Sequence, residues 1–169
     1  MKELADLLHK KIIENFVLQG HNLTGTFVKT LNYNIEQSEG FSIITFYGQG
    51  YAKRLDTGLK PSQIPIAGGG AKTYISGLID YAKLRFGSDS KESKKIAFLI
   101  WRKHQKEGMP TKASYQFSQT GKRTQFITDV LKSDEVKDIL QKQIGYTIQN
   151  KINEFNDKKQ TSTEVSFSM

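Results

Sequence analysis

The chain of 169 residues contains no cysteine, carries 25 Lys and Arg against 17 Asp and Glu, and is 37% hydrophobic. This length suits one domain with its own core. The lack of cysteine excludes a disulfide framework and thiolate chemistry, and it fits a reducing compartment. No apolar run approaches the roughly 18–20 residues that a membrane-spanning helix needs, so no membrane partner is expected.

The N-terminal third predicts a helix followed by a β-hairpin. Apolar residues recur at helical spacing over residues 3–18, and Gly20 follows as a stop. Residues 26–36 alternate between apolar and polar side chains, which predicts a half-buried strand. Residues 41–48, rich in β-branched and aromatic side chains, predict a second strand after a turn. Because two strands alone are marginal in water, further strands or a partner chain are expected.

The middle of the chain predicts a loop and two helices. Residues 48–72, which contain all three of the adjacent glycines "GGG" and two prolines, predict a loop arm that ends in a flexible linker. Apolar stripes predict helices over 75–86 and from about 90 to 107. Asp89 caps the second of these, and Gly108 stops it.

The C-terminal third predicts a short helix over 124–132 and a longer one that begins after Ser133. The apolar residues of the longer helix repeat every four positions: Val136, Leu140, Ile144, Ile148 and Ile152. Together the elements predict an α+β fold, in which a small antiparallel sheet with a β-hairpin is packed by three to four helices. The expected organisation is a single domain over 1–157, with the loop arm at about 48–72, and a polar tail over 158–169.

No motif in the chain predicts catalysis. The segment "GGGAKT" is similar to the end of a phosphate-binding loop, but Ala71 precedes Lys72 and the first glycine of that pattern is missing. The three histidines lie far apart, and without cysteine a zinc site is not expected. No two acids have a spacing typical of acid–base or metal chemistry. The sequence therefore predicts no enzyme, no metal and no cofactor, with a nuclease as the enzymatic alternative.

The positive charge is concentrated in one segment. Residues 83–123 hold eleven Lys and Arg against three Asp and Glu, whereas the rest of the chain is balanced. Such a block indicates a face for a polyanion or for acidic protein, and it is also typical of a solvated helix face. Contacts to DNA there would be to phosphate, hence non-specific and salt-dependent. The residues expected to make them are Lys94, Lys95, Arg102, Lys103, Lys106, Lys112, Lys122 and Arg123.

The last residues carry a weaker pattern. Val165 and Phe167 alternate with polar residues, so the segment could add as an edge strand to a neighbouring chain. The alternative is a frayed terminus.

Three segments together carry a resemblance to a known family. The hairpin leads into "YAKRLDTG", in which Tyr51, Ala52, Leu55 and the Asp56–Gly58 turn follow a pattern found in small neck proteins of tailed bacteriophages. These are head–tail joining or tail-completion proteins. The segments "IAFLIWRKHQKEGMPT" and "KRTQFITDVLKSDEVKDIL" are similar to parts of such proteins from crAss-like phages of gut Bacteroidales. In better-known relatives the acid of this pattern is usually Glu, and Gly precedes Thr in the turn that follows it. These departures leave open which neck component the chain resembles: a portal adaptor, a stopper or a tail-completion ring.

The resemblance implies a structural virion protein without catalysis. It implies a homo-oligomeric ring in the neck, which joins the head portal to the tail and lines or surrounds the DNA channel. The implied partners are copies of the chain, the portal, other neck or tail proteins and packaged DNA, and the implied location is the virion after synthesis in the host cytoplasm. The alternative is a non-specific DNA-binding accessory protein that acts as a monomer or dimer. The expected subunit contacts are Tyr51, Arg54, Leu55, Asp56, Val165 and Phe167.

Overall fold

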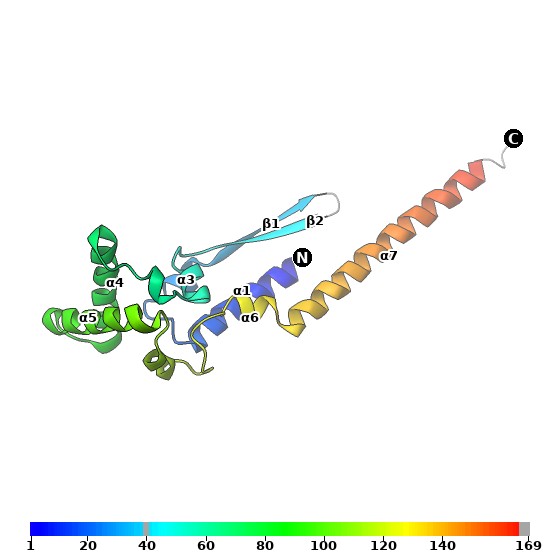
Figure 1. The fold of residues 1–169 in the computed structure, drawn as a ribbon. Helices are drawn as coiled ribbons and strands as arrows, with labels where there is room; N and C mark the ends of the chain where they lie inside the picture. The colour runs from blue at the N-terminus through cyan, green and yellow to red at the C-terminus, as the bar shows by residue number, and fades with distance from the viewer. Residues whose placement is uncertain (39–40, 166–169) are drawn as a thin grey trace.

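A β-hairpin and a long C-terminal helix project from a helical body (Figure 1). The computed structural model describes residues 1–38 and 41–165, and the side chains of that range as far as residue 153. The described part combines a two-stranded antiparallel sheet with several helices, which confirms the α+β prediction.

The core forms around the first helix, α1 (Lys2–Leu18), as its sequence predicts. Its apolar stripe, which ends at Phe16, is buried. The rings of Phe16 and Phe27 stack with their centroids 4.2 Å apart, and Phe126 meets both edge-on at 5.2 and 5.7 Å. Aromatic pairs prefer these offset and edge-to-face arrangements. The remaining buried members of this cluster are Leu4, Leu8, Ile12, Leu31, Ala52, Val130 and Val136.

The hairpin consists of β1 (Asn32–Ser38) and β2 (Phe41–Tyr47), paired in antiparallel register from Asn32 opposite Tyr47 to Ser38 opposite Phe41. The prediction that the first strand begins near residue 26 is wrong, because α2 (Thr26–Thr30) occupies its start. Phe27 and Leu31 have the same parity in a strand, but they also lie four apart and so share one face of a helical turn. The core contacts of both side chains select the helix.

The segment expected as a loop arm over about 48–72 contains regular structure. It includes α3 (Ala52–Thr57), the 3₁₀ helix η1 (Pro61–Gln63) and the start of α4 (Gly68–Phe86). The three glycines of the expected flexible linker form the first turn of α4. The prediction of an extended, flexible arm is therefore wrong for residues 52–57 and 68–72.

A short backbone bridge joins the middle of this segment, at Leu59, to Met109. The N–H groups of Leu59 and Met109 donate to each other's carbonyl oxygens at 2.7 and 2.8 Å. Gly58 and Gly108 precede these residues with φ of 71° and 84°. A side chain at either glycine would meet the opposing backbone, so the bridge requires glycine at both positions.

Helices α4 and α5 (Ser90–Glu107) pack against each other at one end of the body (Figure 1). The turn between them contains Gly87 in the left-handed conformation, with φ of 62°. The Asp89 carboxylate then accepts hydrogen bonds from the backbone N–H groups of Lys91 and Glu92, both at 2.8 Å. The predicted helix cap is confirmed.

Replacing this cap gives a first test of local stability. The variant Asp89→Ala is expected to lower the free energy of unfolding by about 1 kcal/mol, because two N–H groups of α5 lose their acceptor. Urea denaturation measures the change, and Asp89→Asn is the matched control that keeps a capping oxygen. A loss of stability as large in Asp89→Asn would contradict capping as the cause.

The chain closes with the 3₁₀ helix η2 (Lys112–Phe117), α6 (Thr128–Leu131) and α7 (Asp134–Val165). Helix α7 begins where Ser133 predicts, but it continues through most of the expected polar tail. The edge-strand prediction is therefore wrong for Val165, which ends α7, and Phe167 lies outside the described residues.

Candidate functional site

An exposed apolar stripe runs along α7. Leu140, Ile144, Ile148 and Ile152 are 39%, 57%, 54% and 48% exposed. Leucine and isoleucine at regular spacing are normally the buried face of an amphipathic helix. Here the stripe is unpartnered in the described part of the molecule, so it marks an interaction surface.

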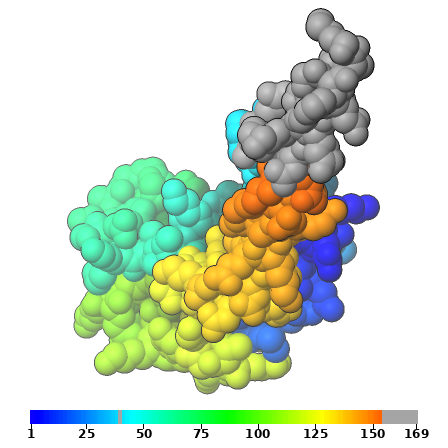
Figure 2. All heavy atoms as spheres, turned by 90° about the vertical axis from the view of Figure 1, so that its right-hand side faces the viewer, coloured from blue at the N-terminus to red at the C-terminus, as the bar shows by residue number. Residues whose placement is uncertain are grey.

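The stripe becomes exposed because the four-residue repeat of α7 starts in the core and turns away from it as the helix leaves the body. Val136 is buried and Ile139 packs against the same cluster. At about 100° per residue, Ile139 lies roughly opposite Ile148, whereas Val136 begins the same repeat, which drifts by about 40° around the helix with every four residues. Beyond its first turns α7 leaves the body (Figure 1), and the space-filling view shows its orange part uncovered (Figure 2).

The chain as a whole exposes more surface than a compact monomer of its size. Its accessible surface is 11861 Å², whereas a compact monomer of 19.2 kDa exposes about 8,400 Å² by the usual scaling with mass. The projecting hairpin adds to the excess, since Phe41 and Ile43 near its tip are 59% and 46% exposed. This shape is typical of a subunit that completes its fold against other chains.

Helix α5 presents the predicted basic face. Lys95, Arg102 and Lys106 are exposed, recur at helical spacing and lie opposite the face that Ala97 and His104 bury. Phe98 and Leu99 are exposed beside them, at 46% and 63%. Lys94 and Lys103 flank this face, and Lys103 pairs with Glu107 at 2.8 Å. We call Lys95, Arg102 and Lys106 the α5 basic face.

The other basic residues of the segment lie elsewhere. Lys112 is exposed at the start of η2, and Lys122 forms an ion pair with Asp129 at 2.7 Å. Arg123 is only 7% exposed, and its guanidinium donates to the carbonyl oxygen of Gln19 at 2.6 Å. The prediction that Arg123 contacts DNA is therefore wrong, because its side chain faces inward. Through this hydrogen bond Arg123 contacts the C-terminal end of α1.

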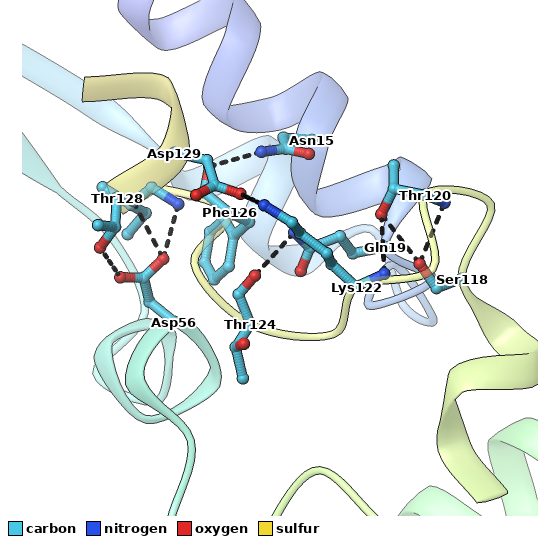
Figure 3. Close-up of polar contacts among 11 residues, drawn as sticks. Asn15, Gln19, Asp56, Ser118, Thr120, Lys122, Thr124, Phe126, Thr128 and Asp129 are labelled. Carbon is cyan, nitrogen blue, oxygen red and sulfur yellow. Dashed lines mark hydrogen bonds and ion pairs between the residues drawn. The ribbon is translucent and has the colours of Figure 1, made fainter. Parts of the chain in front are cut away.

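The four predicted contacts of the "YAKRLDTG" segment divide between surface and interior. Tyr51 and Arg54 are exposed, whereas Leu55 packs against the core and is half-buried. Asp56 is 7% exposed, and its carboxylate accepts hydrogen bonds from the start of α6 (Figure 3). The prediction of a subunit contact is wrong for Asp56. Its acid ties two parts of the body together, which sequence spacing alone does not reveal.

Two histidines are held uncharged at neutral pH. Burial, followed by the nearby charge of Arg123, lowers the pKa of His21 to about 4. Burial also lowers the pKa of His104 to about 4, and the hydroxyl of Tyr74 lies 2.8 Å from its Nδ1 atom. Within residues 1–38 and 41–165, no group of three His, Cys, Asp or Glu side chains is placed to hold a metal ion. No helix in this range is long and apolar enough to cross a membrane.

Comparison of the chain with protein-family models, with characterised proteins and with solved structures finds no match.

Proposed function

We propose that this chain is a structural subunit that assembles into a homo-oligomeric ring, of the kind that joins the head portal to the tail in the neck of a tailed phage. The exposed apolar stripe of α7 carries the proposal. A helix that leaves its own body with isoleucines uncovered needs a neighbour, because exposed apolar surface of this extent is costly in water. The subunit acts by assembly, with no catalytic role.

The spacing of the stripe indicates how two copies would meet. Residues four apart form a ridge inclined to the helix axis, and two such ridges interlock when helices cross at about −50°. A coiled coil needs a spacing of 3.5 instead. Neighbouring α7 helices in the ring are therefore proposed to cross over a short length near Ile144 and Ile148. Gly145, beside which a side chain would find open space, leaves room for close approach there.

The assembly is tested by native mass spectrometry and electron microscopy of the purified chain over a range of concentrations. We expect a closed oligomer with one copy number, because repeated contacts between identical subunits close by rotation. A chain that stays monomeric at hundreds of micromolar, alone and with purified virion components, would contradict the ring. Mass spectrometry of purified virions, with crosslinking, then tests the neck location.

A second candidate function, a non-specific DNA-binding accessory protein, is favoured by the α5 basic face. In a ring this face would be repeated around the axis and give a collar of positive potential for passing DNA. In the alternative, a compact monomer or dimer would bind DNA with nanomolar affinity. Both the ring and the accessory protein would contact phosphate. The affinity for DNA and the size of the particle therefore distinguish the two proposals.

Neutralising the α5 basic face is expected to weaken the salt dependence of DNA binding. Because each phosphate contact contributes about 0.9 to the slope of log K against log salt, Lys95→Gln with Arg102→Gln and Lys106→Gln should flatten the slope by about 2.7. Fluorescence anisotropy with a duplex measures it. The control removes three exposed lysines outside this face: Lys2, Lys29 and Lys142. An equal loss of slope in the control would show that total charge, and not this face, governs binding.

A further inference from the structure

A pocket of about 320 Å³ lies between α4, α5, η2 and the end of α1. Its walls are mainly apolar and include Leu78, Tyr81, Ile100, Met109 and Phe117. Small-molecule sites in proteins begin at about this size, and apolar walls with a few convergent polar groups are typical of them. The polar groups of this pocket therefore determine which class of ligand it can bind.

Two arginines line the pocket on the side of α1. Arg85 donates from Nη2 to the carbonyl oxygen of Gly20, and Arg123 donates from Nη1 to that of Gln19, both at 2.6 Å. The Nε–H groups of both are buried and have no hydrogen-bond partner among the described residues. Each guanidinium thus keeps a donor that the described part of the chain does not use, and Arg123 does so at 7% exposure.

Neither arginine has a counter-ion among the described residues. The acids on the nearby elements are engaged elsewhere: Asp129 pairs with Lys122, Glu107 with Lys103, and Asp56 with α6. The carbonyl groups at the C-terminal end of α1 offset part of the positive charge. Burial lowers the pKa of the Arg123 guanidinium, which shows that the site disfavours the charge it holds. An anion between the two guanidinium groups would relieve that cost.

His21 adds a neutral polar atom to the same wall. Its lowered pKa, about 4, keeps the ring uncharged at pH 7. Its Nε2 atom is buried and has no partner among the described residues. The ring is also hydrogen-bonded to the backbone of Arg123, which fixes it beside that arginine.

We propose that this pocket binds a carboxylate attached to an apolar chain. The carboxylate lies at Arg85 and Arg123, where planar guanidinium groups suit its two oxygens. The apolar chain lies against Leu78 and Ile100. This site is independent of ring assembly, because it is formed within one subunit and shares no residue with the α7 stripe.

Calorimetric titration of the full-length chain with octanoate tests the proposal. Octanol and octylammonium are the matched probes, since they keep the apolar chain and remove or invert the charge. We expect octanoate to bind at least tenfold more tightly than octanol, and octylammonium not to bind. Equal affinity for octanoate and octanol, or no binding of octanoate, would overturn the proposal.

Two variants locate the site. Arg85→Gln should weaken octanoate at least tenfold while leaving octanol unchanged, whereas Arg102→Gln, which removes the same charge from α5 outside the pocket, should change neither. Ala113→Trp fills the pocket from its exposed rim and keeps both arginines, so it should abolish binding even if Arg85→Gln destabilises the chain. Unchanged octanoate binding in Ala113→Trp would contradict the site.

A further titration, with peptides, distinguishes the two sources of such a carboxylate, a partner protein and a free small molecule. A capped Leu-Phe-Glu peptide is compared with its Leu-Phe-Gln counterpart in the same titration. Tighter binding of the Glu peptide than of octanoate supports a carboxylate from the side chain of a partner protein, and the reverse order supports a free small molecule. No preference for Glu over Gln, together with no preference for octanoate over octanol, would remove the carboxylate site altogether.

Discussion

A chain that carries Ile144→Asp and Ile148→Asp is expected to be a folded monomer at concentrations where the parent chain forms a ring. In the proposed interface both side chains are buried against a second copy, and a carboxylate there has no partner. A central interface residue contributes about 2 kcal/mol or more, so the two changes together should weaken association by roughly a thousandfold. Analytical ultracentrifugation measures the shift.

The fold itself should tolerate both changes. The two isoleucines are 57% and 54% exposed, and neither belongs to the core cluster or to the side chains packed against it. The midpoint of thermal unfolding of the monomer should therefore move by only a few degrees. The control, Asn150→Asp with Asn153→Asp, adds the same charge to the opposite side of α7 and keeps the oxygen that Gln149 contacts. If the control dissociates the ring equally, charge and not the stripe is responsible.

Cysteine crosslinking tests the crossing geometry on the same helix. The natural sequence contains no cysteine, so each single variant introduces one defined site. Helices that cross at about −50° diverge within about two turns. We expect disulfides between copies for Ile144→Cys or Ile148→Cys, and few for Leu140→Cys or Ile152→Cys at the two ends of the stripe. Equal crosslinking along the whole stripe would indicate a parallel pair instead.

The sequence predicted the positions of the helices and strands better than the packing between them. Periodicity located α1, the hairpin, α4, α5 and the start of α7, because each has a regular apolar pattern. It failed at Phe27 and Leu31, whose spacing suits both a strand and a helical turn, so that only the packing with Phe16 decides. The polar end of α7 was expected as a tail, because its residues lack the apolar spacing by which a helix is recognised in a sequence.

The candidate sites depend on contacts that spacing does not show. The four-residue repeat of α7 indicated an apolar face, but whether the chain itself covers that face is a property of the three-dimensional arrangement. The inward side chains of Asp56 and Arg123 have partners 71 and 104 positions away in the sequence. The pocket escapes prediction for the same reason, because its walls come from separate elements. Charge counting indicated the basic segment, but not that only part of it gathers on one exposed side of α5.

The variant Asp56→Ala is expected to lower the free energy of unfolding by about 3 kcal/mol or more. The carboxylate accepts from the N–H of Ile127 at 2.7 Å, the N–H of Thr128 at 3.3 Å and the hydroxyl of Thr128 at 2.6 Å (Figure 3). Alanine leaves these donors without their acceptor beside the buried Phe126, and each buried donor left unpaired costs about 1–3 kcal/mol. The loss should loosen the connection between α3 and α6.

Urea unfolding should be measured in the monomeric background of Ile144→Asp and Ile148→Asp, because association would otherwise add to the stability. Asp80→Ala is the matched control. That acid is exposed and lies 3.8 Å from Lys83, so its removal should change stability by no more than about 0.5 kcal/mol. Asp56→Asn, which keeps one accepting oxygen, should fall between the two. If Asp56→Ala instead keeps full stability and, in the parent background, prevents ring formation, then Asp56 is a subunit contact and its internal hydrogen bonds are dispensable.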